Sequence, residues 1–510
     1  MKRAIFWIAL LGLCAGMLPA CGKKEEDASI QLLFRSENAL EGATVADENW
    51  PQGGKPTANA LLQNNSDCWQ AQDPNRHPAD GQEDICYAYA ELKLKNPATF
   101  NTAVIEEVGE EALYFRLQVF ADETWKTIYQ CEKLSSLRVC SFDAATTDRV
   151  RLVIDKFRSS ETPAQIRSLR LYNEPKRPAG DLHVTVYQRL DQDVPTQTLA
   201  RGEEFAKIQA RYYDVYNTVL IFGAIQWDEN GNLLFNCLGD AQEDWDQPRR
   251  EEEFGRQLAA LKELIALRSN QNHEVKIICT GLADGAPANT LMKQHRDKIA
   301  DTLAGFAAKY ELDGLDIDWE YPNTQEDWDN YDAFITRLHS GMEQQRPGAI
   351  LSAALSAWAL KMRPETLALF DQIQFMAYDG GDRDGFQSGM QQAVSGLLDF
   401  ARQGADISKI NIGIAAYGRP LNSAPFWKPW RSLETANYWD CKYLNVPDAG
   451  QVYDGTFCSP ALAGDKLAYA LFSGAGGVMV FRLACDKRMD DPNSVTRGLE
   501  NALNRYVDGW

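Results

Sequence analysis

From residue 181 onward the chain alternates short apolar segments with stretches of helical periodicity, and this alternation constrains the fold more than any other feature. Each apolar segment is short and nearly continuous, which indicates strands that are buried on both faces. Eight such strands between residues 181 and 510 predict a (β/α)8 TIM barrel with insertions. The expected strands are Leu182–Tyr187, Thr218–Ala224, Val275–Thr280, Gly314–Glu320, Ile350–Ser356, Gln372–Tyr378, Ile410–Ala416 and Gly477–Leu483.

The expected helices lie between these strands. Helical periodicity is clearest over Glu252–Arg268, Leu291–Tyr310, Trp328–Gln345 and Asp465–Phe472. Residues 29–173 differ, because they hold alternating apolar and polar runs with little helical periodicity, and they predict a small β-sandwich domain. Residues 174–180 are a linker by composition. The chain is therefore expected to be multidomain, with the barrel at 181–510.

The segment Leu312–Pro322 carries four carboxylates in an otherwise apolar run. If it is a strand, alternation places Asp316, Asp318 and Glu320 on one face. Closely spaced carboxylates repel each other, so one of them is expected to hold a proton near neutral pH. A protonated acid at a strand end is a candidate general acid. Glu320 ends the fourth expected strand, and catalytic groups of such barrels gather at the C-terminal ends of strands.

This segment reads Asp-x-x-Asp-x-Asp-x-Glu followed by Tyr-Pro, and it resembles the signature of glycoside hydrolase family 18, the chitinases and endo-β-N-acetylglucosaminidases. The resemblance implies substrate-assisted cleavage, in which the 2-acetamido oxygen of the sugar is the nucleophile. By motif position Glu320 protonates the glycosidic oxygen, Asp318 orients the acetamido group, and Asp316 shares charge or a proton with Asp318. Asp313 precedes the alternating acids and is expected to be structural.

Two later segments also resemble this family. Gln374–Asp379 is similar to its Met-x-Tyr-Asp segment, which implies that the Tyr378 hydroxyl fixes the acetamido carbonyl and that Met376 and Asp379 lie at the sugar. Lys409–Arg419 ends in Tyr-Gly-Arg, as the seventh strand of the family usually does, so Tyr417 and Arg419 are candidate substrate contacts.

The chain departs from the family pattern at two strands. Phe481 stands where most members carry a Trp that forms the floor under the distorted sugar, and Phe offers less area for stacking. The usual Ser-x-Gly-Gly of the third strand is replaced by Cys279–Leu282. Trp358, after the fifth strand, is a further candidate substrate contact. A long insertion before the eighth strand could form either a sugar-binding wall or a hydrophobic mini-core, through Trp427, Trp430, Tyr438 and Trp439.

The first twenty residues predict a lipoprotein signal peptide, with a basic start, an apolar run and Cys21. Leu18–Cys21 resembles a lipobox, which implies lipidation of Cys21; plain signal cleavage is the alternative. Residues 21–28 form a charged tether similar to that of cell-surface lipoproteins of Bacteroidetes, although a solvated linker would look the same. The expected location is the cell envelope of a Gram-negative bacterium, anchored to the outer membrane or the cell surface.

Eleven cysteines fit an exported protein, and three pairs are plausible loop disulfides: Cys68/Cys86, Cys131/Cys140 and Cys441/Cys458. Cys279 and Cys485 lie in apolar runs and are expected to be core residues. No spacing resembles a zinc site, so neither a metal nor another cofactor is expected. The formal charge of −20 argues against nucleic acid as a partner.

The β-rich region resembles the discoidin-like, or coagulation-factor type C, modules fused to bacterial glycosidases, on the residues of Phe100–Glu107, Thr124–Lys126 and Arg149–Ile154. That resemblance implies a carbohydrate-binding module; a purely structural domain is the alternative.

For the whole chain, the leading hypothesis is a retaining hydrolase of β-1,4-linked N-acetylglucosamine glycans, with chitin-like oligomers as substrate. The alternatives are an endo-β-N-acetylglucosaminidase acting on N-glycans and a non-catalytic carbohydrate-binding protein.

Overall fold

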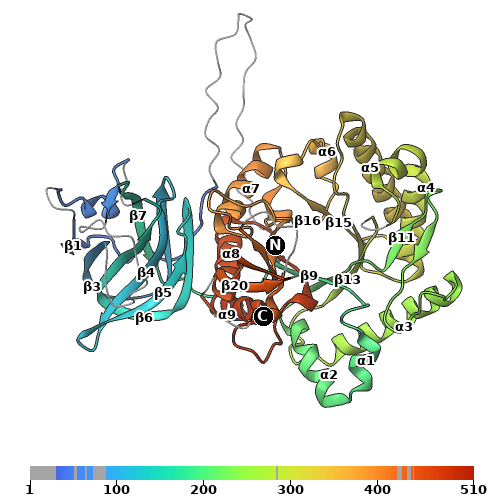
Figure 1. Ribbon diagram of the computed structural model, residues 1–510, viewed down its shortest axis with the longest axis horizontal. Coiled ribbons are helices and arrows are strands. Elements are labelled where there is room, and N and C mark those ends of the chain that lie inside the picture. Colours follow the sequence, from blue (N-terminus) through green and yellow to red (C-terminus); the bar gives the residue numbers. More distant parts are fainter. Residues whose placement is uncertain are drawn as a thin grey trace, which may run out of the picture.

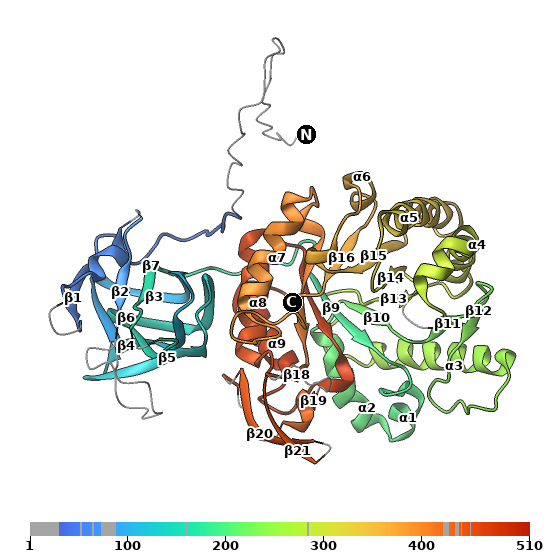
Figure 2. The ribbon, with the colours of Figure 1, turned by 45° about the horizontal axis from the view of Figure 1, so that its top comes forward.

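The computed structural model describes residues 30–510 except 51–53, 64–65, 73–87, 160, 283–284, 422–427, 434–437, 440 and 449. The expected signal peptide, the tether with Cys21, and the aromatic residue Trp427 lie outside the described residues. A β-rich domain and a closed barrel lie side by side, with helices between the two groups of strands (Figures 1 and 2).

The β-rich domain predicted ahead of the barrel is confirmed. Its strands form one antiparallel sheet in the order β2-β7-β3-β6-β4-β5, with β1 paired to β3. The strands β3 and β6 each span 21 residues. Register shifts interrupt their pairing, but the two strands stay hydrogen-bonded to each other within one sheet. The bounds are β1 (Thr44–Glu48), β2 (Trp69–Ala71), β3 (Ala88–Val108), β4 (Ala112–Ala121), β5 (Thr124–Glu132), β6 (Leu137–Phe157) and β7 (Ala164–Tyr172).

The TIM barrel is also confirmed, and each of the eight predicted segments overlaps one of its strands. Neighbouring strands pair in parallel and the ring closes between β22 and β9. The strands are buried almost throughout, as their short apolar sequences predict. The bounds are β9 (His183–Gln188), β10 (Thr218–Ile221), β13 (Lys276–Thr280), β14 (Gly314–Ile317), β15 (Ile350–Leu355), β16 (Gln372–Phe375), β17 (Ile410–Ala415) and β22 (Gly477–Phe481).

Most barrel strands end earlier than predicted, and at two of them the difference affects the candidate site. β14 ends at Ile317 and β16 ends at Phe375, so the prediction that Asp318, Glu320 and Tyr378 lie on strands is wrong. The parallel pairing of β14 ends at Asp316 on the β13 side and at Ile317 on the β15 side, and the chain then leaves the barrel wall. These side chains therefore stand on the segments that follow the strands.

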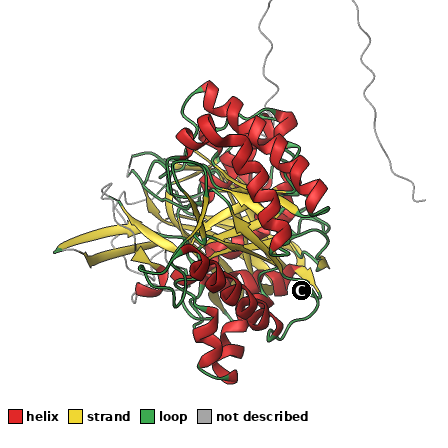
Figure 3. Ribbon diagram, turned by 90° about the vertical axis from the view of Figure 1, so that its right-hand side faces the viewer, coloured by secondary structure: helices red, strands yellow, loops and turns green. Residues whose placement is uncertain are grey.

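The helices surround the barrel strands (Figure 3), and the four predicted helices are confirmed within a few residues. Local signals set their ends: Thr324 and Asp327 form a capping box at the start of α5, and Gly474, with φ +76°, ends α8. The bounds are α1 (Pro195–Ala200), α2 (Glu203–Ala210), α3 (Gln247–Ala266), α4 (Ala288–Lys309), α5 (Gln325–Gln345), α6 (Pro364–Leu367), α7 (Met390–Arg402), α8 (Pro460–Ser473) and α9 (Val495–Tyr506).

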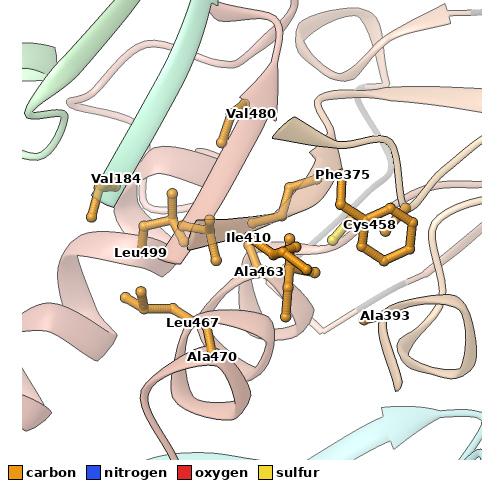
Figure 4. Packing of buried hydrophobic residues seen from close by; sticks show 14 of the residues in the cluster. Val184, Phe375, Ala393, Ile410, Cys458, Ala463, Leu467, Ala470, Val480 and Leu499 are labelled. Atoms are coloured by element: carbon orange, nitrogen blue, oxygen red, sulfur yellow. The ribbon is translucent and has the colours of Figure 1, made fainter. Parts of the chain in front are cut away.

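The core between barrel and helices is made of small and aliphatic side chains (Figure 4). Val184 and Val480, on two neighbouring strands, pack with Leu467 of α8 and Leu499 of α9 in one buried cluster. The two helices approach closely, since a Cβ at Gly498 would lie 2.0 Å from the carbonyl oxygen of Pro460. No helix in the described part of the chain is long and apolar enough to cross a membrane.

The insertion before the last barrel strand forms a small sheet in the order β19-β18-β21-β20. Trp430 beside it is fully buried, packs against the tilted ring of Phe457 with centroids 4.4 Å apart, and donates its indole N–H to the Asn493 carbonyl at 2.6 Å. For Trp430 the mini-core interpretation therefore holds, and the sugar-binding wall is wrong. The bounds are β18 (Tyr417–Pro420), β19 (Lys428–Pro429), β20 (Lys442–Asp448) and β21 (Gln451–Thr456); a hairpin of β11 (Ile225–Trp227) and β12 (Leu233–Phe235) follows β10.

The segment expected to be a linker is held by both domains. β8 (Arg177–Pro178) pairs with β23 (Val507–Asp508) at the C-terminus. The Glu174 carboxylate accepts hydrogen bonds from the backbone N–H groups of Arg35 and Ser36, and it pairs with Arg177 at 2.8 Å. A linker rich in Pro and Gly is thus fixed by pairing that its composition does not reveal.

All described cysteines are free thiols, so the predicted pairs Cys131/Cys140 and Cys441/Cys458 are wrong. Cys131 instead lies next to a cysteine of the other domain, with its Sγ 4.0 Å from that of Cys441. Of the third pair, Cys68 is free and Cys86 lies outside the described residues. Buried positions for Cys279 and Cys485 are confirmed, although Cys485 lies in a 3₁₀ turn rather than a strand.

Candidate active site

Asp316 is the last but one residue of β14 and is completely buried inside the barrel. Its Oδ2 accepts hydrogen bonds from the Tyr187 hydroxyl at 2.8 Å and the Thr280 hydroxyl at 3.1 Å. Its Oδ1 accepts one from Ser352 at 2.8 Å. The three donors come from the strands β9, β13 and β15, so the barrel itself fixes the orientation of this carboxyl group.

Burial raises the pKa of Asp316 from 3.8 to about 6, while the hydrogen bonds from Ser352, Tyr187 and Thr280 oppose the rise. We predicted from the sequence that one acid of this segment holds a proton near neutral pH. The pKa of Asp316 is shifted in the predicted direction by loss of hydration, but at about 6 it leaves this carboxyl mostly ionised at pH 7.

A chain of polar side chains continues below Asp316 through the barrel. The Gln374 amide donates to Ser352 Oγ at 3.1 Å, and the Asn411 amide donates to Gln374 Oε1 at 3.1 Å. His183 Nδ1 lies 3.1 Å from Asn411 Oδ1. Because Ser352 accepts a hydrogen bond from below, its own hydroxyl proton is directed at Asp316. These buried polar groups satisfy one another and hold Ser352 in the donating orientation.

Beyond the strand, the acids become progressively more exposed. Asp318 is 9% exposed, and Glu320 is exposed to solvent. Burial raises the pKa of Tyr378 well above its usual value, and the nearby charges of Asp318 and Glu320 add to this rise. Asp313, at the other end of β14, accepts a hydrogen bond from the Ile277 backbone N–H at 2.8 Å, which is the structural role predicted for it. The segment thus places a buried acid, a nearly buried acid and an accessible acid in sequence.

Aromatic rings gather around these acids. Phe481, at the end of β22, lies 5.5 Å from Tyr187, 5.6 Å from Phe222 and 6.2 Å from Tyr378 between ring centroids. Its ring lies 30° from parallel with that of Tyr378. Such rings offer flat apolar faces on which the C–H faces of a sugar can stack. Phe481 therefore lies among the aromatic rings next to these acids, and its role under the sugar stays a prediction.

Asp379 joins the two other predicted sugar contacts. Its carboxylate accepts a hydrogen bond from the Tyr417 hydroxyl at 2.8 Å and pairs with Arg419 through two hydrogen bonds of 2.8 and 2.7 Å. Asp379 has φ +62°, a left-handed conformation that Asp tolerates better than most residues. The ion pair with Asp379 raises the pKa of Arg419 above its usual value. Segments that follow β16 and β17 are thereby linked at one end of the barrel.

The remaining predicted residues lie near the same end. Trp358 is 76% exposed, and its ring stands edge-on to Tyr321 with centroids 5.2 Å apart. Tyr321 directly follows Glu320, so Trp358 offers an open aromatic face beside the accessible acid. Met376 is partly buried just after β16, and its backbone N–H donates to the Leu355 carbonyl at 3.0 Å.

Sequence reasoning missed the residues that hold Asp316 and complete the aromatic group. Tyr187 and Ser352 lie in strands that we predicted, at points where polar atoms interrupt apolar runs, and that is the signal that could have identified them. Thr280 was noted only as a departure from the family pattern, although its hydroxyl contacts Asp316. Phe222 has no distinguishing signal in an apolar segment.

In the described ranges, no three His, Cys, Asp or Glu side chains are grouped as ligands for a metal ion. A cavity of about 860 Å³ lies beside the first and last barrel strands, lined by residues that include Asp193, Arg201, Arg431 and Lys487. Burial raises the pKa of Asp193 to about 7. None of the predicted site residues lines this cavity, so it is separate from the acids of β14.

Comparisons with known proteins give a consistent result. The model of the glycosyl hydrolases family 18 matches residues 204–486. The secreted chitinase LysM12 of Penicillium expansum is 28% identical over 154 residues, covering 24% of this chain and 10% of that protein. Endochitinase 1 of Metarhizium robertsii is 21% identical over 375 residues, 63% of this chain and 80% of that protein. A chitinase structure from Bacteroides thetaiotaomicron, 19% identical, covers 64% of this chain and 97% of that chain with a TM-score of 0.47.

Proposed function

The chain belongs to family 18 of the glycosyl hydrolases and is chitinase-like, and on this premise we propose that it cleaves β-1,4 bonds of N-acetylglucosamine-containing glycans with retention of configuration. The observation that carries the proposal is the order of the acids Asp316, Asp318 and Glu320 from the end of β14 onward. Asp316 is held by three hydroxyl groups, Asp318 is nearly buried, and Glu320 is accessible.

In the first step, the glycosidic oxygen receives a proton from Glu320 while the acetamido oxygen of the same sugar attacks the anomeric carbon. The bond to the leaving sugar breaks and an oxazolinium ion forms. Asp318 accepts a hydrogen bond from the acetamido N–H and stabilises the positive charge that develops on it. The Tyr378 hydroxyl donates to the acetamido oxygen and holds it at the attacking position.

In the second step, water attacks the anomeric carbon and Glu320, now ionised, takes its proton. The oxazolinium ring opens and the acetamido group is restored, so two displacements leave the configuration unchanged. Asp316, whose pKa lies near 6, supplies a neighbouring group that shares charge or a proton with Asp318.

The proposed substrate is a chitin-type oligosaccharide. The relatives from Metarhizium robertsii and Penicillium expansum are named an endochitinase and a chitinase, and these names support this choice of substrate. An accessible Trp358 beside Tyr321 and Glu320 suits a further sugar unit along the same chain. An endo-β-N-acetylglucosaminidase acting on N-glycans would use the same acids, and a non-catalytic binding protein would use only the aromatic residues.

The test compares Glu320→Gln with Glu326→Gln, a control on α5 whose exposed side chain pairs only loosely with Lys293 at 3.4 Å. Glu320→Gln is expected to lower kcat/KM on chitotetraose by ~10² or more, while binding measured by calorimetry is retained. Glu326→Gln should behave as the wild type. Hydrolysis by Glu320→Gln at the wild-type rate would refute the proposal.

A glycan panel separates the alternatives in the wild type. Release of short products from chitotetraose supports the chitinase assignment. Cleavage of an N-glycopeptide alone supports the endo-β-N-acetylglucosaminidase, and binding without any cleavage supports the carbohydrate-binding protein.

We also propose that a lipid on Cys21 attaches the protein to the cell envelope. Metabolic labelling with a fatty acid tests this, because Cys21→Ser should lose the label.

A further inference from the structure

The β-rich domain contacts the segment that follows β16. We call this segment the rim loop and define it as residues 379–389. This segment begins with Asp379, which binds Tyr417 and Arg419, and ends where α7 begins. Ser136 of the β-rich domain donates from its backbone N–H and its hydroxyl to Gln391, just after the rim loop, at 3.0 and 2.6 Å. In Figures 1 and 2 the β-rich domain lies on the α7 and α8 side of the barrel.

Lys133 is the centre of this contact. Its ammonium group lies 2.7 Å from Asp382, 2.7 Å from Asp384 and 3.0 Å from Glu110, and its side chain is only 3% exposed. Two of these carboxylates belong to the rim loop and the third to the β-rich domain. Burial lowers the pKa of Lys133, but the hydrogen bonds that it donates to Asp382 and Asp384 outweigh burial, and the pKa is raised. One buried cation therefore bridges the two domains.

Two arginines reinforce the same contact from opposite sides. Arg158, from the β-rich domain, pairs with Asp384 through two hydrogen bonds. Arg383, from the rim loop, reaches back to Glu111 at 3.2 Å and to the Gly109 carbonyl at 3.2 Å. Burial raises the pKa of Asp384, but the hydrogen bonds and charges of Arg158 and Lys133 outweigh burial. The pKa of Asp384 therefore lies below its usual value.

The carboxylates that Lys133 binds also shape the loop itself. Asp382 Oδ1 accepts the backbone N–H groups of Asp384 at 2.9 Å and Phe386 at 3.1 Å, so the Asp382 side chain closes a turn while its Oδ2 faces Lys133. Gln387 then connects the turn to the site. It accepts the Asp379 backbone N–H at 3.2 Å and donates to the Tyr417 carbonyl at 2.9 Å.

A second connection runs through neighbouring residues of α8. Asp465 is buried and pairs with Arg138 of the β-rich domain at 2.9 Å. Lys466, the next residue, is buried and donates to the Gly413 carbonyl at 2.9 Å and to Ser388, within the rim loop, at 3.1 Å. Both connections end on the rim loop or on the strand beside it.

We propose that the β-rich domain is a positioning domain, in which Lys133 holds the rim loop so that Asp379, Tyr417 and Arg419 are preorganised to bind the glycan. The inference rests on the proposed function of the acids, and it assigns the β-rich domain a part in substrate binding that does not require a sugar site of its own. Lys133 is a positioning residue, because it contacts the loop and not the sugar.

The test uses the full chain with Lys133→Met and the control Lys126→Met. Lys126 lies on β5, the strand that ends just before Lys133, but it is half exposed and pairs with Asp122 of the β-rich domain. Lys133→Met removes the cation that faces Asp382 and leaves Asp384 paired with Arg158 alone, and KM for chitotetraose is expected to rise on the order of tenfold. The kcat should change less than about threefold, because Asp318 and Glu320 lie on the segment after β14 and not on the rim loop. Lys126→Met should leave both constants unchanged.

Hydrogen exchange of residues 379–389 gives a readout that needs no activity. Exchange should be faster in Lys133→Met than in the wild type, at a temperature well below the melting temperature of the variant. Asp384→Asn, which weakens the same contact from the loop side, should change KM and exchange in the same direction. If both variants have wild-type KM and wild-type exchange in the rim loop, the inference is overturned, even if their melting temperatures fall.

The two proposals fail differently. If the wild type binds and cleaves no glycan, the proposed function is wrong, while faster exchange of the rim loop would still establish the contact. If the wild type is active and Lys133→Met matches Lys126→Met in every readout, the positioning role is wrong and the proposed function stands.

Discussion

The floor and the rim of the site are held by different kinds of structure. The floor, defined as Asp316 with Tyr187, Thr280 and Ser352, is buried and anchored on four barrel strands. The rim, defined as Asp379, Tyr417 and Arg419, lies on segments after the strands, and residues of another domain hold its loop. The closed barrel fixes a buried acid by itself, whereas residues of another domain hold the loop at the proposed substrate-binding edge.

This difference has a physical basis. Hydrogen bonds to a buried carboxylate act in a medium of low polarity, so each bond at the floor counts for more than a similar bond at the surface. The rim pair of Asp379 and Arg419 is about one-third exposed on both sides, so water and salt weaken it. Changes at the floor should therefore have larger effects than changes at the rim, and four predictions test that order.

The largest effect is expected for Asp318→Asn. The amide is neutral and cannot stabilise the positive charge on the acetamido nitrogen, so kcat should fall by ~10²–10³. Steady-state kinetics on chitotetraose measure this, with the melting temperature as a check on folding. A loss below about threefold would remove Asp318 from the mechanism.

Asp316→Asn should change stability in a way that depends on pH. The pKa of Asp316 is raised from 3.8 to about 6, which corresponds to about 3 kcal/mol of disfavoured ionisation in the folded state. This cost is absent below about pH 4, where the carboxyl is neutral in both states, and it develops between about pH 4 and the folded-state pKa of about 6, above which it is fully present. The melting temperature of Asp316→Asn relative to wild type should therefore be higher at pH 8 than at pH 4. A difference that does not vary with pH would contradict the assigned shift.

Tyr187→Phe should have an intermediate effect. It removes a hydrogen bond to a buried carboxyl group, a contribution of about 1.5–3 kcal/mol, so a loss of about tenfold in kcat is expected. Because this bond lowers the pKa of Asp316, its removal should move the corresponding limb of the kcat profile to higher pH. An unchanged profile would show that Tyr187 does not tune the acid.

The smallest effect is expected at the rim. Arg419→Met breaks the pair with Asp379, and an exposed pair of this kind contributes about 0.2–1 kcal/mol, so KM should rise no more than about fivefold. Arg402→Met, on the exposed side of α7, is the control. A rise in KM far above this range would mean that Arg419 binds the sugar directly and strongly.

Much of this arrangement is visible in the sequence, for reasons that differ between floor and rim. Short apolar strands with helices between them predicted the barrel, since burial on both faces leaves a clear pattern in the sequence. The acids after β14 were found because their spacing is distinctive. The strand ends were misplaced, because Asp318 and Tyr378 continue an alternation that the hydrogen bonds between strands no longer support.

The contacts between domains could not be predicted. Lys133, Asp382 and Asp384 are ordinary surface residues by sequence, and only the docking of the β-rich domain brings them together. The same docking places Cys131 beside Cys441, which pairing by nearness in sequence could not anticipate.

Proton NMR of the first product formed from chitotetraose tests the central claim most directly. Participation of the acetamido group predicts that the new reducing end appears first as the β-anomer and then equilibrates with the α-anomer. Initial appearance of the α-anomer would mean a single displacement by water, and it would contradict the substrate-assisted mechanism.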